Sequence, residues 1–237
     1  EQAQTWIKEG KVIVGGFPAT KPATVVEPDV SIKVDVAEGD DWASRGAHKL
    51  LSALEAFGPQ GLDVAGKVAL DAGASTGGFT DVLLKRGARE VIAVDVGYGQ
   101  LIWRLQNDPR VRVLDRTNIR NLTLEQIGHP ADLMVGDLSF ISLKLVLPAI
   151  ADCLAPGADL LPMVKPQFEV GKDRLGHGGV VRSNELRAEV TADVAAYAQS
   201  LGLSVKGVTA SGLPGPSGNV EYFLWLVKDG GAGALDA

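Results

Sequence analysis

The sequence predicts an α/β protein built around a Rossmann-like, doubly wound sheet. Three observations support this fold class. An apolar run that starts at Val68 ends in Asp71 and is typical of a buried strand. Three glycines then bend the chain before an amphipathic helix over 78–85, and the next predicted strand, 90–95, ends in Asp95. A strand, a glycine-rich loop and a helix in this order bind a nucleotide-like cofactor in such folds.

The first 36 residues are predicted to form a small α+β module of their own. The expected elements are a helix over 1–9 and short strands over 11–14, 24–26 and 31–36. Prolines between these segments favour turns. An acidic stretch over 37–43 is predicted to be a linker to a larger domain over 44–228, which an unstructured tail over 229–237 would follow.

A helix that opens at Ser44 is predicted to carry three cationic or potentially cationic side chains in its first turn: Arg45, His48 and Lys49. Ser44 is a suitable N-cap. Because the helix dipole disfavours positive charge at this end, the cluster indicates either a functional site or a solvated basic turn. The apolar positions that run to Phe57 predict packing against the sheet.

The glycine loop favours S-adenosylmethionine over a dinucleotide. The dinucleotide fingerprint is G-x-G-x-x-G, whereas this loop reads D-x-G-x-x-x-G-G, with Ser75 where the second glycine should fall. A carboxylate such as Asp71 would repel a pyrophosphate but suits a ligand with an amino group and a sulfonium. Asp95 is placed to hydrogen-bond ribose hydroxyls. The alternative is a glycine-rich turn and a capping acid with no ligand.

Further cofactor contacts are expected at the ends of the next strands. The glycine-loosened turn that begins at Val96 suits the edge of a cofactor pocket, and Asp115 or Asn118 is placed to reach an adenine or to cap a loop. The complete set of expected cofactor-binding residues is Asp71, Gly73, Ser75, Thr76, Gly77, Gly78, Phe79, Asp95, Val96, Asp115, Asn118 and Asp137.

The rest of the chain continues the alternation of strands and helices. The predicted elements are strands over 111–114, 132–136, 159–164, 204–210 and 220–227, and helices over 143–154 and 183–201. Asp137 and Lys165 each follow a strand, and ligands of open parallel sheets bind at the carboxyl ends of strands. The glycine-rich segment 171–181, with Lys172, Arg174 and the adjoining Arg182, could close over a substrate.

Four ionisable residues lie where folding alone would not place them: Lys49, Asp137, Lys165 and Glu221. Burial and a neighbouring like charge favour the neutral form of a lysine, and a neutral lysine is a plausible general base for a hydroxyl group. The expected reaction is in-line attack of a hydroxyl oxygen on a sulfonium methyl. It needs no metal, and the sequence offers no metal-ligand spacing. The alternative is a pair of structural salt bridges.

Composition limits the possible partners and compartment. The chain has 237 residues, a formal net charge of −6 and 46% hydrophobic residues, so broad electrostatic binding of nucleic acid is disfavoured. One cysteine, Cys153, suits a reducing, cytoplasmic location. No apolar run approaches the roughly 18 residues of a membrane span, and no secretory signal is visible. Because the chain starts at Glu1 and not at Met, we expect a truncated or processed chain.

At these positions the sequence resembles the FtsJ-type ribose 2′-O-methyltransferases, and more closely the TlyA family, which joins an S4 RNA-binding domain to such an enzyme. The segments that carry the resemblance are Ser44–Leu50, Asp71–Thr80, Asp137–Leu143, Val164–Glu169 and Pro216–Glu221. The amino-terminal module, with Trp6 to Val14, resembles the second half of an S4 domain. Two departures are His48, which stands where FtsJ-type enzymes have tyrosine, and the incomplete S4 half.

The resemblance implies a seven-stranded methyltransferase sheet with its last strand antiparallel. It implies S-adenosylmethionine-dependent 2′-O-methylation of cytidines in 16S and 23S ribosomal RNA, with Lys49, Asp137, Lys165 and Glu221 as the catalytic tetrad and Lys165 as the base. Ribosomal RNA or ribosomal subunits are the expected partners. The expected RNA-binding residues are Lys8, Lys11, Arg45, His48, Lys172, Arg174 and Arg182.

Three other functions compete with this one. The same family has been described as haemolysins, which would make the protein membrane-active, although no membrane-inserting helix is predicted. A nicotinamide-dependent dehydrogenase is disfavoured by Ser75. A non-catalytic RNA-binding protein would not need Lys165 for its biological effect.

Overall fold

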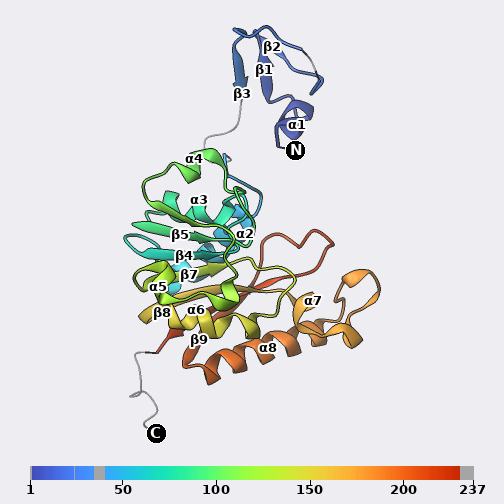
Figure 1. Ribbon diagram of the computed structural model, residues 1–237. Helices are drawn as coiled ribbons and strands as arrows, with labels where there is room; N and C mark the ends of the chain where they lie inside the picture. The colour runs from blue at the N-terminus through green and yellow to red at the C-terminus, as the bar shows by residue number, and fades with distance from the viewer. Residues whose placement is uncertain (1, 24, 35–40, 230–237) are drawn as a thin grey trace. The chain divides into compact units, whose positions relative to one another are not determined.

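The computed structural model describes residues 2–23, 25–34 and 41–229, and the chain divides into two compact units, Glu1–Trp42 and Ala43–Ala237 (Figure 1). The first unit has a helix and a small antiparallel sheet with the strand order β2–β1–β3. Its elements are α1 (Gln2–Lys8), β1 (Val12–Val14), β2 (Phe17–Pro18) and β3 (Ile32–Val34).

One predicted strand of the first unit is wrong. Val25 and Val26 belong to no strand, Val25 is 95% exposed, and Thr24 lies outside the described residues. In its place the sheet contains β2, Phe17–Pro18. Gly15 and Gly16 adopt positive φ angles of 57° and 91°, and the chain therefore turns back at once to pair with β1. The predicted strand over 31–36 is present as β3, although its last two residues lie outside the described part.

The second unit alternates strands and helices, as predicted. Its strands are β4 (Val68–Ala72), β5 (Glu90–Val94), β6 (Val111–Leu114), β7 (Ala131–Gly136), β8 (Leu154–Val164), β9 (Leu203–Ala210) and β10 (Tyr222–Lys228). Its α-helices are α2 (Ala47–Phe57), α3 (Gly78–Lys85), α4 (Trp103–Gln106), α5 (Leu124–Ile127), α6 (Leu147–Asp152), α7 (Pro166–Glu169) and α8 (Asn184–Ser200). Short 3₁₀ helices are η1 (Gly58–Gln60), η2 (Ile119–Asn121), η3 (Leu143–Leu145), η4 (Lys172–Arg174) and η5 (His177–Gly179).

These seven strands form one mixed sheet in the order β6–β5–β4–β7–β8–β10–β9. The strands from β6 to β8 pair in parallel, whereas β10 pairs antiparallel with both of its neighbours, β8 and β9. The predicted seven-stranded sheet with its last strand antiparallel is therefore confirmed. Strand order reverses between β4 and β7, and this switch point lies next to the glycine-rich loop that follows β4.

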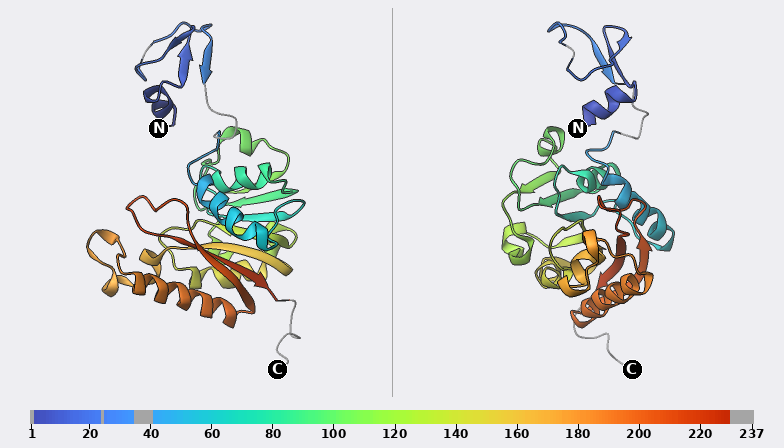
Figure 2. Two further views of the ribbon diagram at one scale, coloured as in Figure 1. Left: turned by 180° about the vertical axis from the view of Figure 1, so that it is seen from behind. Right: turned by 90° about the vertical axis from the view of Figure 1, so that its right-hand side faces the viewer.

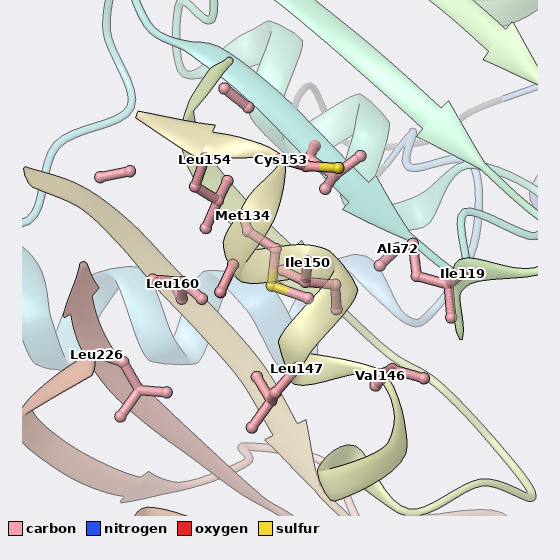
Figure 3. Close-up of a cluster of buried hydrophobic side chains, with 14 of the residues drawn as sticks. Ala72, Ile119, Met134, Val146, Leu147, Ile150, Cys153, Leu154, Leu160 and Leu226 are labelled. Carbon is pink, nitrogen blue, oxygen red and sulfur yellow. The ribbon is translucent and has the colours of Figure 1, made fainter. Parts of the chain in front are cut away.

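Both faces of the sheet are covered by helices (Figures 1 and 2). On one face, alternate residues of the strands pack against α6 and α8, and Figure 3 shows Ala72, Met134, Leu160 and Leu226 in the same cluster as Ile150 of α6. On the other face lie α2 and α3. Asp71 points to this second face, because strand residues alternate in direction and Thr80 of α3 bonds its carboxylate.

Three predicted boundaries differ from the structure. Helix α2 begins at Ala47 after Gly46 and has no side-chain cap, so Ser44 is not its N-cap. The chain over 44–47 instead forms a turn in which the Ala47 N–H bonds the Ser44 carbonyl. The predicted helix over 143–154 is split into η3 and α6, since Pro148 cannot donate a backbone hydrogen bond. Strand β8 starts at Leu154, which pairs with Ala131, five residues earlier than expected.

Candidate active site

The loop between β4 and α3 depends on its glycines. Gly73 and Gly77 have φ angles of 85° and 101°, where L side chains are strained. A Cβ atom on Gly77 would also overlap the side chain of Leu105, and one on Gly73 would lie 3.1 Å from a methyl group of Leu138. The loop therefore packs closely against the segments after β5 and β7, and this close approach requires glycine at these positions.

Asp71 lies beneath this loop with half of its hydrogen-bonding capacity unused. Its side chain is buried, and its Oδ2 accepts a 2.6 Å hydrogen bond from the Thr80 hydroxyl. Its Oδ1 is buried and has no hydrogen-bond partner among the described residues. Burial raises the pKa of Asp71 to about 7, against the lowering effect of Thr80 and with help from the charges of Asp137 and Asp95.

Asp95 joins the next strand end to the same loop. Its Oδ2 accepts a 2.8 Å hydrogen bond from the Ser75 N–H, and its Oδ1 accepts a 2.7 Å bond from the Gly97 N–H. Ser75 holds a positive φ of 47° in this arrangement. The structure thus brings together Asp71, the loop and Asp95, as the sequence predicted for a cofactor site.

The other predicted cofactor residues have varied surroundings. Asp115 accepts a 2.8 Å bond from the Gly99 N–H, and Asn118 caps η2 by accepting from the Arg120 N–H at 3.0 Å. Val96 is 69% exposed. Phe79 is buried, and its ring centroid lies 6.0 Å from that of Phe223, so its side chain belongs to the core.

The four predicted catalytic residues form one cluster of ion pairs. Lys49 Nζ lies 2.6 Å from Glu221 Oε2 and 3.6 Å from Asp137 Oδ2. Lys165 Nζ lies 2.6 Å from Asp137 Oδ1, a close ion pair without hydrogen-bond geometry. Lys49, Lys165 and Glu221 are buried, whereas the side chain of Asp137 is 24% exposed. Asp137 is therefore the shared carboxylate and the tetrad member most open to solvent.

The elements that carry these residues explain how they meet. Asp137 follows β7, and its N–H bonds the Ala72 carbonyl at 3.2 Å, which places it beside the glycine loop. Lys165 follows the adjacent strand β8. Glu221 directly precedes β10, the antiparallel neighbour of β8, and Lys49 lies in the first turn of α2. Lysine at this helix start is unfavourable for the helix dipole, and its pairing with Glu221 offsets that cost.

Three further side chains among the described residues contact the tetrad, and the sequence reasoning missed all of them: Ser139, Gln167 and Met163, whose sulfur lies 3.9 Å from Lys49 Nζ. Lys165 Nζ donates a 2.8 Å hydrogen bond to the Ser139 hydroxyl, and the Gln167 amide donates to Glu221 Oε1 at 3.2 Å. Ser139 and Gln167 each lie two residues after a tetrad member, but Gln167 is in helix α7 and bonds Glu221 from another segment of the chain. Sequence spacing therefore gave no usable signal for this contact.

The predicted RNA-binding residues do not form one cluster within either unit. In the first unit Lys8 is exposed and Lys11 pairs with Glu9 at 2.9 Å. In the second unit Arg45, His48, Arg174 and Arg182 are exposed. Arg174 forms an ion pair with Glu189, and the side chain of Lys172 is not among those described.

The described residues offer neither a metal-ligand group nor a membrane-spanning helix. In that part of the chain no three His, Cys, Asp or Glu side chains are grouped so that they could hold a metal ion. Within the same residues, no helix combines the length and the apolar character that crossing a membrane requires.

Comparison with known proteins gives consistent matches. Residues 42–228 match the family model described as FtsJ-like methyltransferase. The chain is 59% identical over 226 residues to 16S/23S rRNA (cytidine-2′-O)-methyltransferase TlyA of Mycobacterium tuberculosis, covering 95% of this chain and 83% of that protein. It is 35% identical over 227 residues to Hemolysin A of Brachyspira hyodysenteriae, covering 95% and 92%. The solved structure of a candidate hemolysin from Streptococcus thermophilus matches with a TM-score of 0.79 at 38% identity, covering 96% of this chain and 82% of that one.

Proposed function

The chain belongs to the TlyA branch of the FtsJ-like methyltransferase family, and from this premise we propose that it methylates ribose 2′-oxygens of cytidines in 16S and 23S ribosomal RNA. The methyl donor is S-adenosylmethionine. The observation that carries the proposal is the cluster of Lys49, Asp137, Lys165 and Glu221 beside the glycine loop. Because ribosomal RNA is the proposed substrate, we propose a cytoplasmic location for the protein.

The residues around the loop fit the proposed donor. Asp71 Oδ1 is an acceptor that no described residue bonds, which suits the ammonium group of the methionine moiety. Asp95 lies at the end of β5, the place where a ribose-binding acid stands in related nucleotide sites. Asp115 and Asn118 remain the proposed contacts for the adenine. The donor supplies a methyl carbon made electrophilic by its positively charged sulfur.

In the proposed reaction Lys165 acts as the general base. A neutral amine has two N–H bonds and one lone pair, and Lys165 has two acceptors within reach, Asp137 Oδ1 at 2.6 Å and Ser139 Oγ at 2.8 Å. The hydrogen bond to Ser139 and the close approach of Asp137 hold the Lys165 amine in place, so that its lone pair, once the amine is neutral, can accept the proton of the ribose hydroxyl. The proton of that hydroxyl passes to Lys165 as the oxygen–carbon bond forms and the carbon–sulfur bond breaks.

The other two members of the tetrad keep this geometry in place. Glu221 neutralises Lys49, and Lys49 approaches the second oxygen of Asp137 at 3.6 Å. Asp137 is thus held between the side chains of Lys49 and Lys165, which fixes the orientation of its carboxylate relative to Lys165. We propose that Lys8, Lys11, Arg45, His48, Lys172, Arg174 and Arg182 contact RNA phosphates.

The test uses methyl-labelled S-adenosylmethionine with unmodified small and large ribosomal subunits, followed by alkaline digestion of the RNA. Label in alkali-resistant dinucleotides is the expected result, because a 2′-O-methyl group blocks cleavage of the neighbouring phosphodiester bond. Label released as ordinary mononucleotides would mean base methylation and would contradict the assigned chemistry. Isolated ribosomal RNA, run in parallel, identifies whether free RNA or the assembled subunit is the substrate.

Membrane lysis is a second function to test, because two of the similar proteins are described as hemolysins. Dye release from liposomes with the same protein preparation measures it directly, and we expect none above the buffer control. Lys165→Ala separates the enzyme from a non-catalytic RNA-binding protein. The enzyme loses methyl transfer in this variant, whereas an RNA-binding protein keeps its full biological effect.

A further inference from the structure

The segment that follows Lys165 returns to the active site at its far end. Helix α7 comes directly after Lys165, and the chain then runs through 171–182, which carries Lys172, Arg174 and Arg182. Residues 171–182 are called the basic segment below. A small apolar cluster of Val170, Val181 and Val190 packs the two ends of this segment against α8.

The side chain of Asn219 clasps the carboxyl-terminal end of the basic segment. Its Oδ1 accepts a 2.9 Å hydrogen bond from the Val181 N–H, and its Nδ2 donates a 2.9 Å bond to the Gly179 carbonyl. Asn219 is only 3% exposed. One buried amide therefore replaces the backbone pairing that a neighbouring strand would supply, across a gap of 38 to 40 residues in the sequence.

The turn that carries Asn219 also contacts the catalytic carboxylate. The Gly215 N–H bonds the Asn219 carbonyl at 2.9 Å, and the Gly218 N–H bonds the Gly215 carbonyl at 2.8 Å. A Cβ atom on Gly215 would lie 2.6 Å from Glu221 Oε1, so this turn packs directly on the carboxylate. The same oxygen accepts the hydrogen bond from Gln167 of α7. Both ends of the basic segment thus connect to Glu221.

We propose that Asn219 is a positioning residue that couples the basic segment to the tetrad. RNA that binds the cations of this segment fixes the position of the 179–181 backbone. Because Asn219 is hydrogen-bonded to that backbone, the turn that carries Asn219 and packs on Glu221 is fixed with it. Glu221 in turn holds the position of the Lys49 side chain by their ion pair, and Lys49 does the same for Asp137. This inference rests on the proposed function, because it assigns the basic segment to the RNA substrate.

The experiment compares wild type with Asn219→Ala, Asn219→Asp and Asn107→Ala. Asn219→Asp keeps the acceptor for Val181 and removes the donor to Gly179. Asn107→Ala is the matched control. Asn107 is exposed, directly follows α4, and donates a side-chain hydrogen bond to the Trp103 carbonyl. Three quantities are measured for each protein: tryptic cleavage within the basic segment, cofactor affinity, and kcat and KM for methylation of ribosomal subunits.

We expect Asn219→Ala to raise the rate of cleavage after Lys172, Arg174 and Arg182 by about 10- to 30-fold, the effect of losing two hydrogen bonds on a locally opening segment. We expect kcat to fall about 10-fold or more while cofactor affinity changes less than about 2-fold. Asn219→Asp should fall between Asn219→Ala and wild type, and Asn107→Ala should match wild type in all three measurements.

Each other outcome has a definite meaning. Faster cleavage with unchanged kcat and KM would overturn the coupling and leave the proposed function intact. An unchanged rate of tryptic cleavage in Asn219→Ala would contradict the claim that Asn219 holds the carboxyl-terminal end of the basic segment. Loss of cofactor affinity together with activity in both Asn219 variants would assign the residue to overall folding and overturn the inference. If wild type transfers no methyl group to RNA, the proposed function fails, and the cleavage comparison still decides whether Asn219 holds the segment.

Discussion

At the scale of single residues, the two lysines of the tetrad differ in what their removal would leave behind. Glu221 is 1% exposed and has Lys49 as its close cationic partner, whereas Asp137 is 24% exposed and lies between both lysines. A buried carboxylate that loses its cation is strongly destabilising, whereas a partly solvated one is less so. Removal of Lys49 is therefore expected to destabilise the folded protein more than removal of Lys165, even where both are needed for activity.

Lys165→Ala is expected to lower kcat by about 10² to 10⁴ with little change in cofactor affinity or thermal stability, because it removes the base from a partly solvated pair. Lys49→Ala is expected to lower the free energy of unfolding by about 3–5 kcal/mol as well as the activity. Calorimetry and single-turnover methylation measure the two effects. The control is Lys206→Ala on the exposed side of β9, and equal stability losses in both lysine variants would contradict this assignment.

Asp71 makes stability depend on pH in the cofactor-free protein. Its pKa of about 7 lies above the ordinary value of 3.8, so the folded state holds this proton more tightly than the unfolded chain. Its contribution is fully present below the unfolded pKa and is lost as pH rises to about 7, by at most about 4 kcal/mol. Asp71→Asn removes this dependence. We expect the variant to gain stability over wild type at pH 8 and to gain much less at pH 5.

Denaturant unfolding of both proteins at the two pH values checks this expectation, since all other titrating groups cancel in the difference. An equal stability difference at pH 5 and pH 8 would mean that Asp71 titrates normally. The same variant should bind S-adenosylmethionine more weakly at pH 8, because it replaces the carboxylate that we propose for the ammonium group.

At the scale of secondary-structure elements, Asp81 of α3 ties three segments together. It is 1% exposed, and its carboxylate accepts two hydrogen bonds from the Arg104 guanidinium of α4, at 2.5 and 2.8 Å. It also accepts a 2.9 Å bond from the Ala43 N–H, just before the turn that leads to Lys49. The start of the catalytic unit is therefore fixed to the helix that follows the glycine loop.

Arg104→Ala is expected to lower the free energy of unfolding by about 1–3 kcal/mol, because it leaves a buried carboxylate short of its bidentate partner while the arginine itself is partly exposed. Arg110→Ala is the matched control. Arg110 pairs with Asp108 at the surface, and its loss should cost about 0–1 kcal/mol. Urea titration of the two variants makes the comparison, and equal losses would show that the Asp81 pair contributes no more than a surface pair.

Sequence patterns predicted the elements of the second unit better than those of the first. Apolar runs such as 68–71 and 159–164 are long enough to identify a buried strand, whereas Val25 and Val26 form a pair too short to decide between strand and turn. The proximity of Asp137, Lys165 and Glu221 was predictable because charged residues at buried strand ends are costly without a partner or function, whereas Lys49 was singled out by its unfavourable place at a helix start. Ser44 failed as a cap because its hydroxyl packs against Gly78, a tertiary contact that the local sequence does not contain.

At the scale of the whole molecule, net charge limits how the protein can bind RNA. The chain carries a formal charge of −6, and Lys11 and Arg174 are already paired with Glu9 and Glu189. We expect no more phosphate contacts than the seven residues proposed above can make, and so a slope of log affinity against log salt no steeper than about −6 for ribosomal subunits. Filter binding between low and moderate salt measures this slope. A slope steeper than about −6 would require a cationic surface that the composition does not support.

The position of β10 in the sheet has a consequence for the protein during its own synthesis. Among the strands of the described residues β10 is the last to leave the ribosome, yet it lies between β8 and β9 and not at an edge. A nascent chain that ends before Lys228 therefore cannot place β9 in its final position, and β8 keeps an unpaired edge until then. Glu221 arrives with the same stretch. With Glu221 in the role proposed above, we expect methyl transfer only after β10 has been inserted.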